Sequence, residues 1–254
     1  VPPGELGLRQ SDALFFHVKG LPELAGRLFS HVDGNDVRAV GVSTRPRAVE
    51  GSYMPCFLAG VCLAETVAAL RRVPLVQVSH QQGHLAAAAW SAGWLDLLDR
   101  PFLAWHLSGG PTELLRVEPE EDGVAVRAEI LGGTSDISAG QLIDRTGVLL
   151  GLPFPAGKEV EKLSRQAQKR EYYKVKVKDL TFSLSGMENK VRQMVQRGEE
   201  PAEVAWFAQE TVCRVVQACT KAAMGAYPGL PVLCSGGVAS NRLLRTVMSD
   251  AAFA

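Results

Sequence analysis

Residues 79–90, SHQQGHLAAAAW, place two histidines four residues apart. On a helix, an i, i+4 spacing puts both imidazoles on one face, within reach of one metal ion. Zinc proteases carry H-E-x-x-H, with the glutamate as general base, whereas this chain has Gln81 at that position, which cannot act as a base. Because two imidazoles need a third ligand, His80 and His84 are either part of a metal site or the polar start of a helix.

Two identical Ser-Gly-Gly turns each follow a short apolar segment, at Ser108–Gly110 and at Ser235–Gly237. Glycines at a strand end allow close approach of the backbone to a ligand, and successive N–H groups there can bind an anion. Neither turn is a Walker loop or a G-x-G-x-x-G motif. Two such turns from different halves of the chain could hold a nucleotide between two lobes, although either turn alone is better explained as an ordinary tight turn.

The segment 143–157, IDRTGVLLGLPFPAG, adds a carboxylate and a glycine. Asp144 lies within an amphipathic pattern, and Gly157 ends a proline-rich turn. A carboxylate near a nucleotide commonly accepts hydrogen bonds from ribose hydroxyls. The alternative is a solvated acid paired with Arg145 or another neighbour.

Hydrophobic periodicity predicts the elements that must position these residues. It predicts helices over 7–29, 54–73, 138–152, 187–197 and 201–226, and a helix from His80 with Ser79 as its N-cap. Predicted strands are 37–42, 74–79, 102–107, 112–119, 124–131 and 172–182, and residues 231–248 read as strand, glycine turn and helix. This mixture favours an α/β protein with mixed sheets. A change of pattern at residues 99–101 marks the expected boundary between lobes.

Composition narrows the class of protein. Of 254 residues, 46% are hydrophobic and 21% charged, which is typical of a globular chain, and the net charge is zero. A nucleic acid would therefore need a local basic patch. The five cysteines form no C-x-x-C pair, which favours reduced thiols in a cytoplasmic protein. No apolar run reaches the length of about 20 residues that spans a membrane, so no membrane partner is expected.

Five ordered motifs carry a resemblance to a known family: SHQQGHLAAA, LSGGPTELL, DISAGQLIDRTGVLLGLPFPAG, FSLSGMENKV and SGGVASNRLLR. In this order they resemble the TsaD/Gcp family of tRNA threonylcarbamoyladenosine synthases, formerly described as O-sialoglycoprotein endopeptidases. The segment GLRQSDALFFHVKGLPEL is similar to a divergent branch found in clostridia and their relatives. The resemblance covers nearly the whole chain.

The resemblance implies an actin-like ATPase fold (ASKHA, ribonuclease H-like) with two lobes and mixed sheets. Residues 1–100 would form an N-terminal lobe with the histidine pair, and residues 101–254 a second lobe with both Ser-Gly-Gly turns. It implies one divalent metal ion, iron or zinc, at His80 and His84. Nucleotide or substrate contacts are implied for His106, Leu107, Ser108, Gly109, Gly110, Asp144, Gly157, Glu161 and Asn241.

The implied reaction transfers the threonylcarbamoyl group from threonylcarbamoyl adenylate, an adenine nucleotide, to the adenosine beside the tRNA anticodon. Metal coordination would polarise the reacting carbonyl. The implied partners are tRNA and TsaB-like and TsaE-like proteins, and the chain could form a homodimer. Lys174, Lys176 and Lys178 alternate on the predicted strand 172–182 and are candidate tRNA contacts, with a lysine-protected sheet edge as the alternative.

Three departures from the family pattern bear on activity. Pro111 stands where the family's S-G-G-H-T motif has histidine, and proline removes a backbone donor. The family's opening D-T-S strand and its C-terminal D-N motif, which supplies a third metal ligand, are not found, so we expect the chain to be truncated at both ends.

Two other functions remain open at this stage. The first is a non-catalytic, nucleotide-binding paralogue that acts as a partner or regulator, although such relatives generally lack the histidine pair. The second is a metal-dependent glycoprotein endopeptidase, which is disfavoured because the sequence offers neither an acyl-transfer triad nor a glutamate base.

Overall fold

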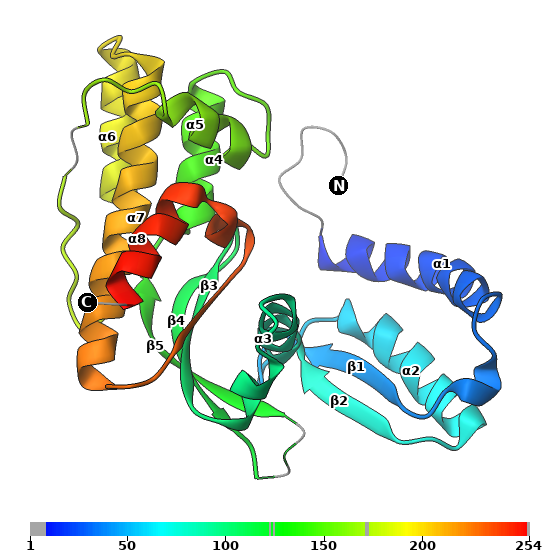
Figure 1. Ribbon diagram of the computed structural model, residues 1–254. Helices are drawn as coiled ribbons and strands as arrows, with labels where there is room; N and C mark the ends of the chain where they lie inside the picture. Colours follow the sequence, from blue (N-terminus) through cyan, green and yellow to red (C-terminus); the bar gives the residue numbers. More distant parts are fainter. Residues whose placement is uncertain (1–8, 122, 124, 171–172, 253–254) are drawn as a thin grey trace. The chain divides into compact units, whose positions relative to one another are not determined.

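A computed structural model describes residues 9–121, 123, 125–170 and 173–252 (Figure 1). The predicted residues 7, 8, 124 and 172 lie outside this range. The chain divides into two compact units, residues 1–87 with 120–127, and residues 88–119 with 128–254. The predicted lobes, 1–100 and 101–254, divide the chain at one point, whereas each compact unit consists of two segments. The lobes stay a prediction.

The first unit holds a two-stranded parallel sheet, in which β1 (Val40–Arg45) pairs with β2 (Leu75–Ser79). The helices are α1 (Gln10–Phe29), α2 (Phe57–Arg71) and the start of α3 (His80–Ser91), with a short 3-10 turn at Gly34–Asp36. Each of these helices and strands was predicted within a few residues. The predicted N-cap of α3 is confirmed, because the Ser79 Oγ accepts the backbone N–H of Gln82 at 3.2 Å.

The second unit is built on a five-stranded sheet in the order β6-β5-β4-β3-β7. Strand β3 pairs antiparallel with β4 and parallel with β7, so the sheet is mixed, as predicted. The strands are β3 (Phe102–Leu107), β4 (Thr112–Pro119), β5 (Val126–Thr134), β6 (Thr181–Phe182) and β7 (Val232–Ser235).

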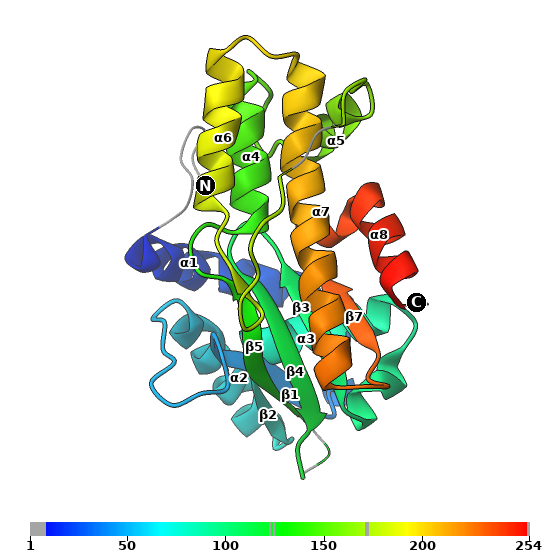
Figure 2. The same cartoon turned by 90° about the vertical axis from the view of Figure 1, so that its left-hand side faces the viewer.

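Helices cover this sheet and enclose its core. They are α4 (Ala139–Leu149), α5 (Gly157–Ser164), α6 (Ser185–Gln196), α7 (Pro201–Ala226) and α8 (Arg242–Ala252), with 3-10 turns at Leu95–Asp99 and Gly237–Ser240. Figure 2 shows α6 and α7 side by side, with α4 next to them. The core lies between the sheet and α7, around the fully buried Trp105, whose indole N–H donates to the Thr220 hydroxyl at 2.8 Å.

The predicted strand over 172–182 is wrong apart from β6. The predicted alternation of exposed and buried side chains is present. The exposed residues are Lys174, Lys176 and Lys178, and the valines between them are half-buried against the core. A strand also needs a paired backbone, and the segment is followed by Asp179 and Leu180 in left-handed conformations with φ of 49° and 60°. Within the described residues, 173–180 form one isolated bridge, between Lys178 and Thr181, and the Leu180 carbonyl accepts the Gly133 N–H at 2.9 Å. The alternation therefore reflects anchoring by valines and not pairing into the sheet.

Helix α5 was not predicted. It follows the proline-rich turn directly and has only 8 residues, so its apolar pattern consists of little more than Val160 and Leu163. Short helices of this kind carry too few periodic positions to be recognised.

Candidate functional site

The two Ser-Gly-Gly turns lie side by side. Because β3 and β7 are parallel, with His106 opposite Ser235, both turns leave the sheet at the same edge. Gly236 has φ of 94°, and a Cβ there would lie 2.2 Å from the Leu107 carbonyl oxygen, so no other residue fits. Both turns belong to the second unit, so the possibility that they hold a nucleotide between two lobes does not fit these units.

The first turn is closed by Pro111. The backbone N–H and the hydroxyl of Ser108 donate to the Pro111 carbonyl at 3.0 and 3.2 Å, and the Gly110 N–H donates to the Ser108 hydroxyl at 3.1 Å. The proline thus lacks a donor, but its carbonyl holds the turn in place.

Helix α4 begins directly against this turn. Its N-cap Ser138 forms a capping box with Gln141, and the Ser138 hydroxyl donates to the Gly109 carbonyl at 2.9 Å. The Gly140 N–H donates to the Ser108 carbonyl at 3.1 Å, and a Cβ on Gly140 would lie 2.6 Å from the Gly109 nitrogen. The turn and the helix start therefore form one tightly packed backbone unit.

These elements surround a cavity of about 420 Å³ in the second unit. Five of the predicted site residues line it: Gly109, Asp144, Gly157, Glu161 and Asn241. Gly237 of the second turn lines it too. The cavity is within the usual size range for small-molecule sites, about 300–1,000 Å³.

The other predicted contacts lie elsewhere. His106, Leu107, Ser108 and Gly110 are outside the cavity lining, and the Leu107 side chain is fully buried in the core. Leu107 therefore serves the core and offers no exposed surface to a ligand. Several lining residues were not predicted from the sequence: Gly140, Ile143, Pro155, Lys158, Val238 and Ser240. Of these, Lys158 could have been found from its place directly after Gly157.

Asp144 lines the cavity and holds the proline-rich turn before Gly157 in place. Its Oδ1 accepts the Ala156 N–H at 2.8 Å, which holds the turn before Gly157 against α4. Asp144 does not pair with Arg145, because neighbours on a helix point about 100° apart. Glu161, also at the cavity, pairs with Arg165 one turn along α5.

Asn241 is buried between the cavity and the start of α8. Its Oδ1 accepts the Leu244 N–H at 3.0 Å and so caps the helix. Because the carbonyl end of the side chain is engaged in this cap, the amide nitrogen Nδ2 is the end that remains to donate.

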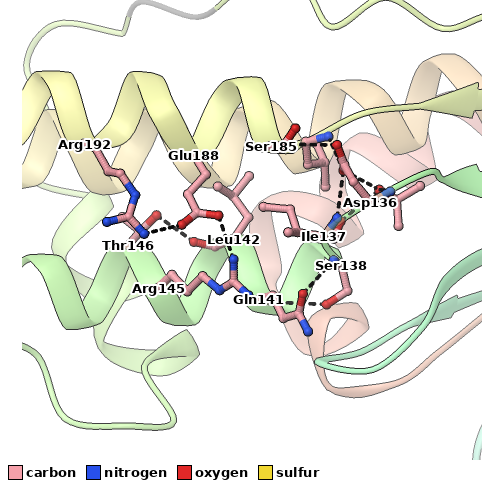
Figure 3. A network of polar contacts seen from close by, with 12 residues as sticks. Asp136, Ile137, Ser138, Gln141, Leu142, Arg145, Thr146, Ser185, Glu188 and Arg192 are labelled. Atoms are coloured by element: carbon pink, nitrogen blue, oxygen red, sulfur yellow. Dashed lines mark hydrogen bonds and ion pairs between the residues drawn. The ribbon is translucent and has the colours of Figure 1, made fainter. Parts of the chain in front are cut away.

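Arg145 docks α4 on α6 (Figure 3). It donates to Glu188 at 2.8 Å, and Arg192 donates to the other carboxylate oxygen of Glu188. Burial acts to raise the pKa of Glu188, but hydrogen bonds from Arg192 and Arg145 outweigh it and lower that pKa. The two arginines keep Glu188 ionised, and the Arg145–Glu188 ion pair holds α4, the helix that carries Asp144, against α6.

Asp136 makes a second link to α6, also visible in Figure 3. Its carboxylate accepts the Leu184 N–H at 2.8 Å, the Ser185 N–H at 3.3 Å and the Ser183 hydroxyl. Although burial acts to raise the pKa of Asp136, these hydrogen bonds hold it well below its usual range. Asp136 therefore caps the start of α6 from a different segment of the chain.

Replacing Asp136 by alanine should lower the free energy of unfolding by about 1–2 kcal/mol at pH 7, the usual cost of a lost helix cap. The folded-state pKa lies below the unfolded value of about 3.9. The contribution is therefore fully present above about pH 5 and is lost as the pH falls through the folded-state pKa. Urea unfolding of both proteins between pH 7 and pH 3 measures it. A difference in stability that grows toward low pH would contradict this assignment, and Asp12→Ala on the exposed face of α1 is the control.

The histidine pair lies in the first unit, on the first turns of α3. The Nε2 atoms of His80 and His84 are 2.9 Å apart. Two nitrogens bound to one ion at about 2.0–2.1 Å would be separated by about 3 Å, so the geometry fits a shared metal ion. Burial, and then the charge of His84, lower the pKa of His80, which favours the neutral form that binds metals. Among the described residues, no group of three His, Cys, Asp or Glu side chains could hold an ion.

The three candidate lysines lie on another side of the second unit. Figure 1 shows their segment on the side of α7 that faces away from α8, whereas Asn241, directly before α8, lines the cavity. Contact of Lys174, Lys176 and Lys178 with tRNA stays a prediction. In the part of the chain that the structure describes, no helix is both long and apolar enough to cross a membrane.

Comparisons with solved structures show the fold. Full-length HypF in its phosphate- and nucleotide-bound form matches with a TM-score of 0.59 and 14% identity, over 86% of this chain and 51% of that one. HypF of T. kodakarensis matches with a TM-score of 0.62 and 13% identity, over 92% of this chain and 39% of that one. The predicted actin-like ATPase type of α/β fold is confirmed.

Comparisons of sequence show the family. A protein of Lacticaseibacillus casei named tRNA N6-adenosine threonylcarbamoyltransferase is 34% identical over 225 residues, which cover 85% of this chain and 62% of that protein. One of Archaeoglobus fulgidus with the same name is 28% identical over 246 residues, covering 97% of this chain and 71% of that protein. The chain thus spans less than two thirds of the length of the first relative. Residues 12–254 match the family described as "TsaD: tRNA N6-adenosine threonylcarbamoyltransferase", and the chain belongs to this family.

Proposed function

We propose that this protein transfers a threonylcarbamoyl group from threonylcarbamoyl adenylate to the adenosine next to the anticodon of tRNA. The observation that carries the proposal is the cavity formed by two glycine turns, Asp144 and Asn241, in a chain of this family. In the transfer, the exocyclic amine of adenosine forms a bond to the carbamoyl carbon. The bond between that carbon and the phosphate oxygen breaks, AMP leaves, and the amine loses a proton.

The residues of the cavity suit the adenylate. Backbone N–H groups of the two turns can donate to its phosphate, and the Asp144 carboxylate can accept hydrogen bonds from the ribose hydroxyls. Lys158 lines the cavity and can place its positive charge next to the phosphate. Its charge is available because no ion pair of Lys158 is found among the described residues, and the nearby Glu161 is already paired with Arg165. The same donors would stabilise the charge that moves onto the phosphate as AMP leaves.

His80 and His84 would hold one divalent ion, which we propose to be iron or zinc. When bound, such an ion would supply Lewis acidity toward a carbonyl oxygen. The histidines would hold it through the Nε2 atoms that already lie 2.9 Å apart.

We also propose a protein partner, of the TsaB-like or TsaE-like kind, or a second copy of the chain, in the cytoplasm. The supporting observation is an apolar surface on α1, where five large side chains are more than half exposed: Phe15, Phe16, Val18, Leu24 and Leu28. Exposed patches of this kind often mark protein interfaces.

The function is tested with unmodified tRNA, threonylcarbamoyl adenylate and the native gene product, with and without TsaB-like and TsaE-like proteins. The measured quantity is threonylcarbamoyladenosine in digested tRNA, by mass spectrometry. We expect His80→Ala/His84→Ala to lose its metal and to slow transfer at least about 100-fold, since a Lewis acid supplies several kcal/mol.

The affinity of the double variant for AMP is the internal control, because neither histidine lines the cavity. It should stay within about twofold of the wild type. Transfer at the wild-type rate without metal would contradict the role of the histidines. AMP binding without transfer under every condition would instead favour the non-catalytic paralogue.

A further inference from the structure

Gln82 lies between the two histidines in the first turn of α3. Its side chain is buried, with 8% of its surface exposed. The first turn of a helix has N–H groups with no partner inside the helix, so it needs partners from outside to stay formed. The positions of His80 and His84 depend on this turn.

Three hydrogen bonds converge on Gln82. Its Oε1 accepts the Ser79 N–H at 2.6 Å, and its own N–H donates to the Ser79 hydroxyl at 3.2 Å, which completes a reciprocal capping box. Its Nε2 donates to the Val126 carbonyl at 2.7 Å. Val126 begins β5 and belongs to the same compact unit as the start of α3.

The chemistry of this position requires an amide. One end of the side chain must accept a hydrogen bond from a backbone N–H while the other end donates to a backbone carbonyl. A carboxylate could do the first but would face the Val126 carbonyl with a second acceptor. Val126 is 44 residues from Gln82 along the chain, so this contact is tertiary.

We infer that Gln82 is the positioning residue of the histidine pair: it locks the first turn of α3 to Ser79 and to the start of β5. This inference rests on the metal site of the proposed function. It assigns Gln82 no contact with the metal or with substrate. Its effect is to hold the two Nε2 atoms at the separation that one ion requires.

The test compares Gln82→Ala, Gln82→Glu and Gln81→Ala in the native protein. Gln81 is the matched control, because it is the same residue type, is 7% exposed, and its side chain makes no hydrogen bond among the described residues. Zinc affinity is measured by competition with a chelator, and amide hydrogen exchange of residues 79–84 is measured on the metal-free proteins.

We expect Gln82→Ala to weaken zinc binding by about 10–100-fold, as found for residues that orient metal ligands. Exchange at residues 79–84 should become faster. Gln82→Glu should do the same to a smaller extent, because it keeps the bond to Ser79. Gln81→Ala should leave the affinity for zinc within about threefold of the wild type.

Wild-type affinity and exchange in Gln82→Ala would overturn the inference, as would an equal loss in Gln81→Ala. If the wild-type protein bound no metal, the metal of the proposed function would fail. Hydrogen exchange would still decide the inference in that case, because unchanged exchange in Gln82→Ala would show that Gln82 does not hold the turn.

Discussion

Replacing Gly140 by alanine is expected to lower both the stability of the second unit and its affinity for nucleotide. The new Cβ would lie 2.6 Å from the Gly109 nitrogen and 2.6 Å from the Ser108 carbonyl oxygen. Both atoms belong to the backbone, so no side chain can rotate away. Either α4 or the first glycine turn must move.

Overpacking of this kind costs about 1–3 kcal/mol of the free energy of unfolding. A displaced turn would also weaken binding, because each hydrogen bond from its backbone to the charged phosphate contributes about 1.5–3 kcal/mol and depends on the position of the turn. Chemical denaturation measures the first effect and calorimetric titration with AMP the second.

Gly186→Ala is the matched control. Gly186 is an exposed residue of α6, and a Cβ there would meet nothing within 4 Å. Alanine is the better helix former, so this variant should be neutral or more stable by up to about 1 kcal/mol. If Gly140→Ala destabilised the protein yet bound AMP like the wild type, the cavity would not be the nucleotide site.

The sequence predicted most of the elements that form this cavity, but not how they come together in space. Strands and long helices follow from periodicity, and the two glycine turns follow from Ser-Gly-Gly after an apolar run. Their meeting depends on the parallel pairing of β3 with β7, which are more than a hundred residues apart. Local patterns carry no information on such pairing, so the sequence pattern did not show that the two turns meet at one end of the sheet.

Gly140 and Gln82 show the same limit at the level of single residues. A glycine in a helix pattern indicates close packing, but only the folded chain reveals that Gly109 is the neighbour. Gln82 was visible only as a residue between two histidines. Its importance comes from Val126, whose carbonyl the fold brings within 2.7 Å.

Replacing Asn241 by aspartate is expected to separate two roles of one side chain. Aspartate caps a helix as well as asparagine does, so the bond from the Leu244 N–H should survive and stability should change by less than about 0.5 kcal/mol. The donor Nδ2 is replaced by an anionic oxygen beside the cavity. Nucleotide affinity should fall at least about tenfold, from the lost hydrogen bond and from repulsion of the phosphate.

Two further variants make the comparison decisive. Asn241→Ala removes the cap and the donor together, so it should lose about 1 kcal/mol of stability as well as affinity. Asn189→Asp makes the same chemical change on the exposed surface of α6, away from the cavity, and should alter neither. Wild-type affinity in Asn241→Asp would mean that the amide nitrogen does not face the ligand. Weaker binding at unchanged stability would assign the carbonyl end of Asn241 to the helix and its amino end to the nucleotide, because the change leaves the capping oxygen in place and puts an anionic oxygen where the amide nitrogen was.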